Sequence, residues 1–149
     1  MPNVPFQPAG IDHVVLRVKD VPGALGFYEN VLGLRVERAQ EEIGLWQLRA
    51  GSALIDLVAA DGVIGRRGGA APGREGRNMD HVAIAIRPFD SAKLRAHLAA
   101  HGVAIEGEAA ANYGATGESP ALYIRDPEGN FIELMGQGTG ALAADREST

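Results

Sequence analysis

Two stretches of the sequence carry the same pattern, IDHVVLRVKD at residues 11–20 and MDHVAIAIRP at residues 79–88. Each is rich in aliphatic and β-branched residues, which predicts a strand with an Asp-His pair at its second and third positions. A second pair of similar stretches lies further along, ALIDLV at residues 53–58 and NFIELM at residues 130–135. Because an internal repeat determines the architecture, we expect two copies of one small module.

The elements between these landmarks predict the order strand, helix and three strands in each copy. In the first copy we expect a strand at 11–18, a helix at 21–32, and strands at 35–39, 43–50 and 53–59. In the second copy we expect a strand at 79–86, a helix that Asp90 caps and Gly102 ends, a strand that begins at 103–106, a Gly/Ala-rich loop at 107–119, and strands at 121–125 and 131–135. The sequence therefore predicts an α+β fold of two βαβββ modules.

Turn-forming and polar segments set the expected boundaries. Residues 61–78 contain six glycines and four arginines without periodicity, which predicts a linker; its arginines could hold an anionic substrate, although such a loop is more often solvated. The expected organisation is an extended arm at 1–10, modules at 11–60 and 79–137 within one domain at 11–137, and a loose tail at 138–149.

The composition excludes several classes of protein. There are 14 Lys and Arg against 19 Asp and Glu, a formal net charge of −5, so nucleic-acid binding is not expected. No apolar run approaches the roughly 20 residues that span a bilayer, and the N-terminal stretch lacks the features of a secretory signal. With no cysteine, thiolate nucleophiles, thiolate metal sites and disulfides are excluded. We expect a cytoplasmic protein that does not bind membranes.

Two histidines and two acids occupy equivalent places in the repeat. His13 and His81 are third in their strands, and Asp56 and Glu133 are fourth of six in theirs. An acid inside an apolar strand is costly to bury unless it is paired or metal-bound; pairing with a nearby arginine is the alternative. If the first and last strands of each module are neighbours, two facing modules present both pairs to one divalent ion. Such ligands suit Zn²⁺, Ni²⁺, Fe²⁺, Mn²⁺ or Co²⁺.

Four motifs resemble the vicinal oxygen chelate superfamily: DHVVLRVKD, FYENVLGL, DHVAIAI and YIRDPEGNFIELMG. This superfamily includes glyoxalase I, methylmalonyl-CoA epimerase, extradiol dioxygenases and fosfomycin-resistance enzymes. The resemblance covers residues 11 to about 137. It implies paired βαβββ modules that form a mixed sheet curled around a metal site, often completed across a homodimer. It also implies the four metal ligands, which are His13, Asp56, His81 and Glu133.

The resemblance to glyoxalase I implies a reaction. Glu133 would move a proton between adjacent carbons while the metal, as a Lewis acid, stabilises an enediolate. Arg17 matches an arginine that holds a carboxylate of glutathione in glyoxalase I. Phe131 and Met135 share the strand face of Glu133 and are expected to line the substrate pocket. We therefore expect a metal-dependent lyase or isomerase of the lactoylglutathione lyase type, acting on a small carbonyl substrate or its thiol adduct.

Two positions depart from glyoxalase I, and other functions stay open. Asp56 replaces a glutamate, and Ala60 stands where some bacterial glyoxalases have a glutathione-binding asparagine. A non-haem iron extradiol-type dioxygenase would use His13, His81 and Glu133 as its triad. A fosfomycin-type thiol transferase and a drug-binding protein are further alternatives. Trp46 and Tyr123 are expected in the core or the cavity wall.

Overall fold

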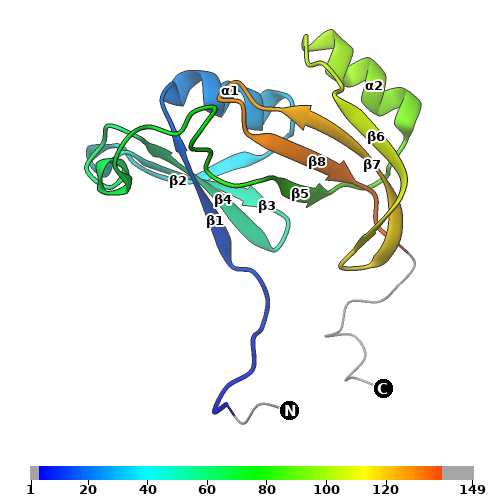
Figure 1. The fold of residues 1–149 in the computed structure, drawn as a ribbon, viewed down its shortest axis with the longest axis horizontal. Coiled ribbons are helices and arrows are strands. Elements are labelled where there is room, and N and C mark those ends of the chain that lie inside the picture. Colours follow the sequence, from blue (N-terminus) through cyan, green and yellow to red (C-terminus); the bar gives the residue numbers. More distant parts are fainter. Residues whose placement is uncertain (1–3, 139–149) are drawn as a thin grey trace.

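The computed structural model describes residues 4–138, in which each half of the chain folds as a strand, a helix and three strands (Figure 1). The first module contains β1 (His13–Val18), α1 (Val21–Asn30), β2 (Arg35–Gln40), β3 (Leu45–Ala50) and β4 (Ala53–Ala59). The second contains β5 (Val82–Ala85), α2 (Ser91–Ala100), β6 (Gly107–Gly114), β7 (Gly117–Arg125) and β8 (Phe131–Met135). The predicted α+β fold of two βαβββ modules is confirmed.

Both helices begin at an aspartate, as the sequence predicts. Asp20 Oδ1 accepts a hydrogen bond of 3.1 Å from the backbone N–H of Gly23, and Asp90 Oδ1 accepts one of 3.1 Å from that of Lys93. These bonds satisfy N–H groups that have no partner inside the helix. After α1 the chain turns at Gly33, whose φ of 71° favours glycine.

Each module forms one four-stranded sheet, with strand orders β1-β4-β3-β2 and β5-β8-β7-β6. The first and last strands of each module are parallel neighbours, β1 with β4 and β5 with β8, and the other pairs are antiparallel. The neighbour relation that the candidate site requires is therefore confirmed in both modules.

One apolar core joins the two sheets and both helices. Alternate residues of the strands point into it because successive side chains of a strand face opposite sides. Its fully or almost fully buried members include Leu16, Leu57, Tyr28, Leu98, Leu122, Ile132 and Leu134. The other face of each sheet therefore carries the remaining alternate residues, including the candidate site.

The prediction for residues 103–119 is wrong. No strand forms at 103–106, and the expected loop is the hairpin of β6 and β7, paired from Gly107 with Tyr123 to Gly114 with Gly117. Backbone hydrogen bonds hold this ladder, and they need no β-branched side chain. Glycine and alanine therefore gave no strand signal there. The strand expected at 43–50 begins at Leu45 because a 3₁₀ helix, η1 (Glu41–Ile43), precedes it.

A buried polar cluster fastens the two modules together. The Tyr28 hydroxyl of α1 donates a 2.7 Å hydrogen bond to Asp126 Oδ2 in the turn between β7 and β8. Asn130 Nδ2 donates to the same oxygen, and Asn130 Oδ1 accepts from Asn78 Nδ2. The Asn78 side chain also bonds the backbone N–H and C=O of Arg17 in β1. The DPEGN motif thus acts as a clasp between modules.

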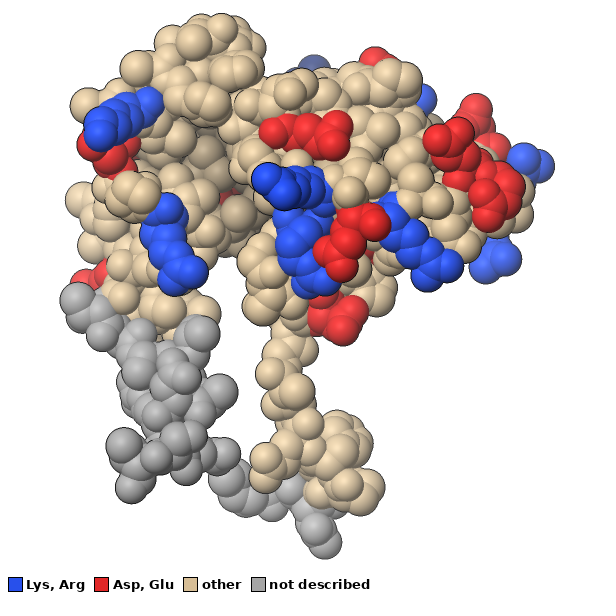
Figure 2. Space-filling view, turned by 180° about the vertical axis from the view of Figure 1, so that it is seen from behind, with Lys and Arg blue, Asp and Glu red and all other residues tan. Residues whose placement is uncertain are grey.

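The described part of the N-terminal arm leaves the body without joining either sheet (Figure 1). Its Phe6 is exposed. Of the expected arm, residues 1–3 lie outside the described residues, as do residues 139–149 of the expected tail. Among the residues described, no helix has the length and apolar character needed to cross a membrane. On the face in Figure 2, basic and acidic side chains of the described residues intermingle without a continuous basic surface.

Candidate functional site

The two histidine and carboxylate pairs lie at equivalent positions on the sheet faces that point away from the core. In the first module, Asp56 of β4 is paired in register with Val15, two residues after His13. In the second, Glu133 of β8 is paired with Ala83, two residues after His81. The same diagonal therefore relates the histidine to the acid in both modules, so the structure repeats the geometry that the sequence repeat implies.

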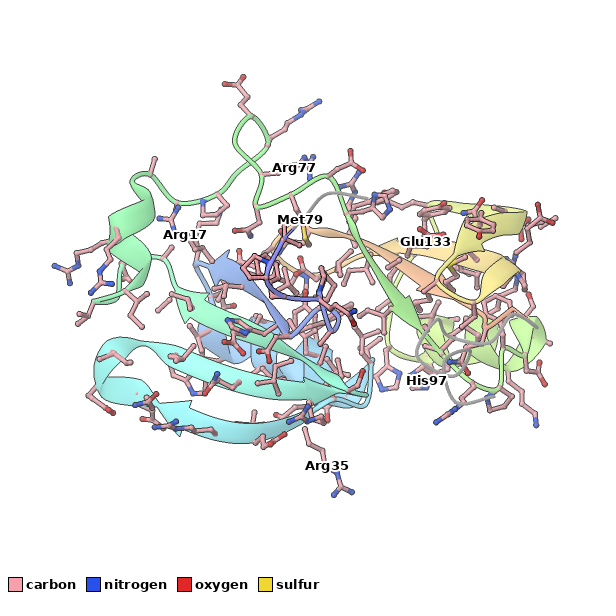
Figure 3. All side chains as sticks on the ribbon, turned by 90° about the horizontal axis from the view of Figure 1, so that it is seen from below. Arg17, Arg35, Arg77, Met79, His97 and Glu133 are labelled. Atoms are coloured by element: carbon pink, nitrogen blue, oxygen red, sulfur yellow. The ribbon has the colours of Figure 1, made fainter. Side chains whose placement is uncertain are left out.

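The pair in the second module is closely held. His81 Nε2 lies 3.3 Å from Glu133 Oε2, and the other ring nitrogen, Nδ1, lies 2.5 Å from Asp80 Oδ2. Asn112 Nδ2 of β6 donates a 2.7 Å hydrogen bond to Glu133 Oε1. Glu133 is only 6% exposed, and Figure 3 shows it in the second sheet. One carboxylate oxygen is thus held by an amide and the other faces the imidazole.

The pair in the first module has matching supports. His13 Nδ1 lies 2.6 Å from Asp12 Oδ1, and Gln47 Nε2 of β3 donates a 3.1 Å hydrogen bond to Asp56 Oδ2. The hydrogen bond that the His13 ring donates to Asp12, together with the negative charge of Asp56, raises the pKa of His13 above its ordinary value. Asp56 is 3% exposed, and its Oδ1 has no hydrogen-bond partner in the described structure.

These supports suit metal binding. Where an aspartate holds Nδ1 of a histidine, Nε2 is the nitrogen that remains for a metal, and such outer partners orient ligands in metalloproteins. An amide on one carboxylate oxygen leaves the second oxygen as a monodentate ligand. A buried acceptor without a donor, such as Asp56 Oδ1, is costly and calls for a cation or a donor. Imidazole nitrogen and carboxylate oxygen together fit a divalent ion of the first transition row.

Sequence reasoning missed the supporting residues to different degrees. Asp12 and Asp80 are visible in the repeated Asp-His pair, although the sequence alone gave them no role. Gln47 could have been found from the strand alternation, since it pairs in register with Asp56. Asn112 gave no signal, because it lies in the segment that was predicted to be a loop.

Within one chain the two pairs stay apart. Among residues 4–138, no three His, Cys, Asp or Glu side chains gather closely enough to hold one metal ion. The four predicted ligands therefore lie as two separate pairs in the described chain: His13 with Asp56, and His81 with Glu133. Each pair is called a half-site below.

The two expected pocket residues of the second module lie on either side of Glu133 along β8. Phe131 and Met135 share its strand face. The ring of Tyr123 stacks on Phe131, with centroids 5.5 Å apart, and its hydroxyl oxygen lies 2.6 Å from Asn112 Nδ2. Trp46, in contrast, is partly buried and packs against the core. The substrate-contacting roles of Phe131 and Met135 stay predictions.

Arg17 lies on the same strand face as His13, but its guanidinium contacts the linker. It donates four hydrogen bonds to the carbonyl oxygens of Gly65, Gly68, Gly69 and Ala70. Two linker arginines also bond backbone carbonyls, Arg66 those of Gly62 and Asp61, and Arg77 that of Gly129. The predicted contact of Arg17 with substrate remains a prediction.

Comparisons with known proteins agree with this architecture. The family model described as Glyoxalase/Bleomycin resistance protein/Dioxygenase superfamily matches residues 10–134. Over 125 residues the chain is 30% identical to Virulence protein STM3117 of Salmonella typhimurium, an alignment that covers 83% of this chain and 81% of that protein. The crystal structure of that virulence protein superimposes with a TM-score of 0.69 at 26% identity, covering 89% of this chain and 99% of that one.

Two more distant structures share the fold alone. Lactoylglutathione lyase of Agrobacterium tumefaciens gives a TM-score of 0.59 at 20% identity, over 87% of this chain and 94% of that one. A genomically encoded fosfomycin resistance protein of Listeria monocytogenes gives 0.65 at 18% identity, over 96% of this chain and the whole of that one. Relatives of one fold thus have names that point to different chemistries.

Proposed function

Since the chain belongs to the glyoxalase/bleomycin resistance protein/dioxygenase superfamily, we propose that it is a divalent-metal-dependent lyase or isomerase of the glyoxalase type. One observation carries the proposal: two histidine and carboxylate pairs in the same register, each supported by an aspartate and an amide. The substrate is a small carbonyl compound, free or as a thiol adduct, that reacts through an enediolate.

The metal would be held by His13 and Asp56 of one protomer together with His81 and Glu133 of the partner subunit. Each protomer offers two ligands on one open sheet face and two on the other. A two-fold axis that places the first half-site of each chain against the second half-site of its partner completes two identical sites. The homodimer is therefore part of the proposed catalytic unit. A bound divalent ion would supply Lewis-acid stabilisation of the enediolate.

Glu133 is the proposed base. Its Oε1 is held by Asn112, so Oε2 would serve as the metal ligand when no substrate is bound. With substrate present, the same oxygen is the one that can take a proton from the substrate carbon and return it to the adjacent carbon. Burial of Glu133 keeps bulk water from exchanging that proton freely. Ala83 and Ala85 lie beside β8 in register with Glu133 and Met135. Their small side chains leave room for the substrate above the carboxylate.

The first experiment compares Glu133→Gln with Glu42→Gln, which changes an exposed glutamate outside the site. The wild-type protein is expected to bind one divalent ion per protomer and to convert a methylglyoxal hemithioacetal. In deuterium oxide most of the transferred hydrogen should come from the substrate, because Glu133 is buried. Loss of the base should lower kcat by about 10²–10⁴-fold, while Glu42→Gln keeps wild-type activity. Equal turnover by both variants would remove the base assignment. Iron in the purified protein with oxygen uptake on catechols would favour the dioxygenase instead.

The second experiment tests the shared site by mixing two inactive variants, His13→Ala and His81→Ala. After subunits exchange, a mixed dimer has one site with all four ligands and one site with both histidines missing. With random exchange about a quarter of all sites become complete, so about a quarter of the wild-type activity should return. If each chain held its own complete site, mixing would restore nothing.

A further inference from the structure

The loop at residues 65–70 occupies the guanidinium of Arg17. Arg17 Nε donates to Gly65 O at 2.8 Å, Nη1 to Gly68 O at 3.2 Å and Ala70 O at 3.0 Å, and Nη2 to Gly69 O at 2.7 Å. A guanidinium has five N–H groups, and a bidentate carboxylate contact needs two of them side by side. Four of the five are already used, so no free fork remains for a ligand carboxylate.

Two glycines make this contact possible. A Cβ added to Gly68 would lie 2.6 Å from Arg17 Cζ, and one added to Gly65 would lie 1.9 Å from the carbonyl oxygen of Ala59. Real Cβ atoms essentially never come so close to other heavy atoms, so the loop reaches Arg17 only because residues 65 and 68 lack side chains. Figure 3 shows Arg17 beside η2 (Gly65–Gly68) of this loop.

The position of the contact bears on the substrate. Arg17 is on the strand and face of His13, four residues along β1, which is roughly 13 Å. Ala60 follows β4, the neighbour of β1, and borders an open pocket of about 340 Å³. The wall of this pocket includes Gly69 of the loop and Ala71 just after it. The loop therefore stands over the end of the open face that lies beyond the half-site.

We propose that the loop at residues 65–70, latched onto Arg17, is the specificity element of the site and excludes substrates that carry a glutathione arm. The hydrogen bonds to the loop occupy the Arg17 guanidinium, which would otherwise bind the carboxylate of such an arm. The loop also covers the end of the sheet face that lies beyond His13. The substrate class is then a small carbonyl compound or its adduct with a small thiol. This inference rests on the proposed function, which it narrows.

The main test measures kcat/KM for the methylglyoxal hemithioacetals of glutathione and of 2-mercaptoethanol. A bidentate arginine contact would favour the glutathione adduct by roughly 10–100-fold. We expect a ratio near one for the wild type, and no saturable binding of S-methylglutathione at millimolar concentration in calorimetry. A wild-type preference of tenfold or more that Arg17→Met abolishes would overturn the proposal.

Two glycine variants test the latch itself. Gly68→Ala drives a methyl group into the guanidinium, so the loop should leave Arg17, trypsin should cut faster at the linker arginines, and S-methylglutathione should begin to bind. Gly73→Ala is the matched control, because a Cβ there meets nothing within 4 Å. Equal trypsin rates in both variants would show that the latch does not hold the loop. Proteolysis and calorimetry do not depend on turnover. If the protein were inactive but Gly68→Ala still gave faster cleavage and S-methylglutathione binding, the proposed function would be refuted and the latch would be supported.

Discussion

Replacing Asn112 with alanine should weaken metal binding through Glu133. The Asn112 amide donates a 2.7 Å hydrogen bond to Oε1 of Glu133, a residue that is 6% exposed. Hydrogen bonds to charged groups contribute about 1.5–3 kcal/mol, and loss of an outer partner of a metal ligand typically costs about 10–100-fold in affinity. At about 1.4 kcal/mol per tenfold the second range is about 1.4–2.8 kcal/mol, so the two estimates agree.

The assay is competition between the protein and a chelator for Co²⁺, with the Co²⁺ absorption spectrum as a second readout of ligand geometry. Asn30→Ala, which changes an exposed residue at the end of α1, is the control. Asn112 also donates to the Tyr123 hydroxyl, and Tyr123→Phe separates that contact from the one to Glu133. We expect the Co²⁺ affinity of Tyr123→Phe to stay within about threefold of the wild-type affinity, a change as small as that of a typical surface substitution. An Asn112→Ala protein with the affinity and spectrum of Asn30→Ala would refute the reasoning.

Three further predictions concern the clasp and the linker. Tyr28→Phe removes a buried bond to Asp126 and should lower the unfolding free energy in urea by about 1.5–3 kcal/mol, whereas Tyr113→Phe, at an 86% exposed site, should change it by less than about 0.5 kcal/mol. Burial and Asp126 raise the pKa of Tyr28 above its ordinary 10.0, so wild-type stability should fall as the pH rises above that value, and Tyr28→Phe should reduce this slope in urea titrations at high pH. Gly65→Ala should lower thermal stability by the equivalent of about 1–3 kcal/mol, as overpacking does, and Gly73→Ala should leave the melting temperature unchanged.

The residues that could be predicted are those whose side chains leave a pattern. His13 and His81, with Asp56 and Glu133, stand out because polar groups interrupt apolar strands at repeated places, and strand alternation then fixes their faces. That the first and last strands are neighbours was only a condition of the predicted site, and the structure shows them to be parallel neighbours in both modules. The β6–β7 hairpin left no pattern, because backbone groups that every residue has hold its Gly/Ala-rich strands.

The latch on Arg17 escaped prediction for the same reason. Its four acceptors are backbone carbonyls, which no sequence pattern distinguishes, and only the glycines hint that a close approach is needed. The resemblance to glyoxalase I predicted Arg17 to be a ligand-binding residue. A comparison of sequences matches the residue type at a position but does not show what its side chain contacts. A chain can therefore keep the residue of a family site while its loop gives that residue another contact.

The division of the ligands between two open faces has a thermodynamic consequence for the proposed dimer. Each module buries one sheet face in the common core and carries its predicted ligand pair on the other face. An ion that needs ligands from both protomers binds the dimer far better than the monomer. Metal binding and subunit association are then linked. The free energy by which the metal stabilises the dimer must equal the free energy by which dimer formation strengthens metal binding. Asp56 Oδ1, which is buried without a hydrogen-bond partner in the described structure, would give this coupling a physical source, because a cation bound at the completed site would compensate its desolvation.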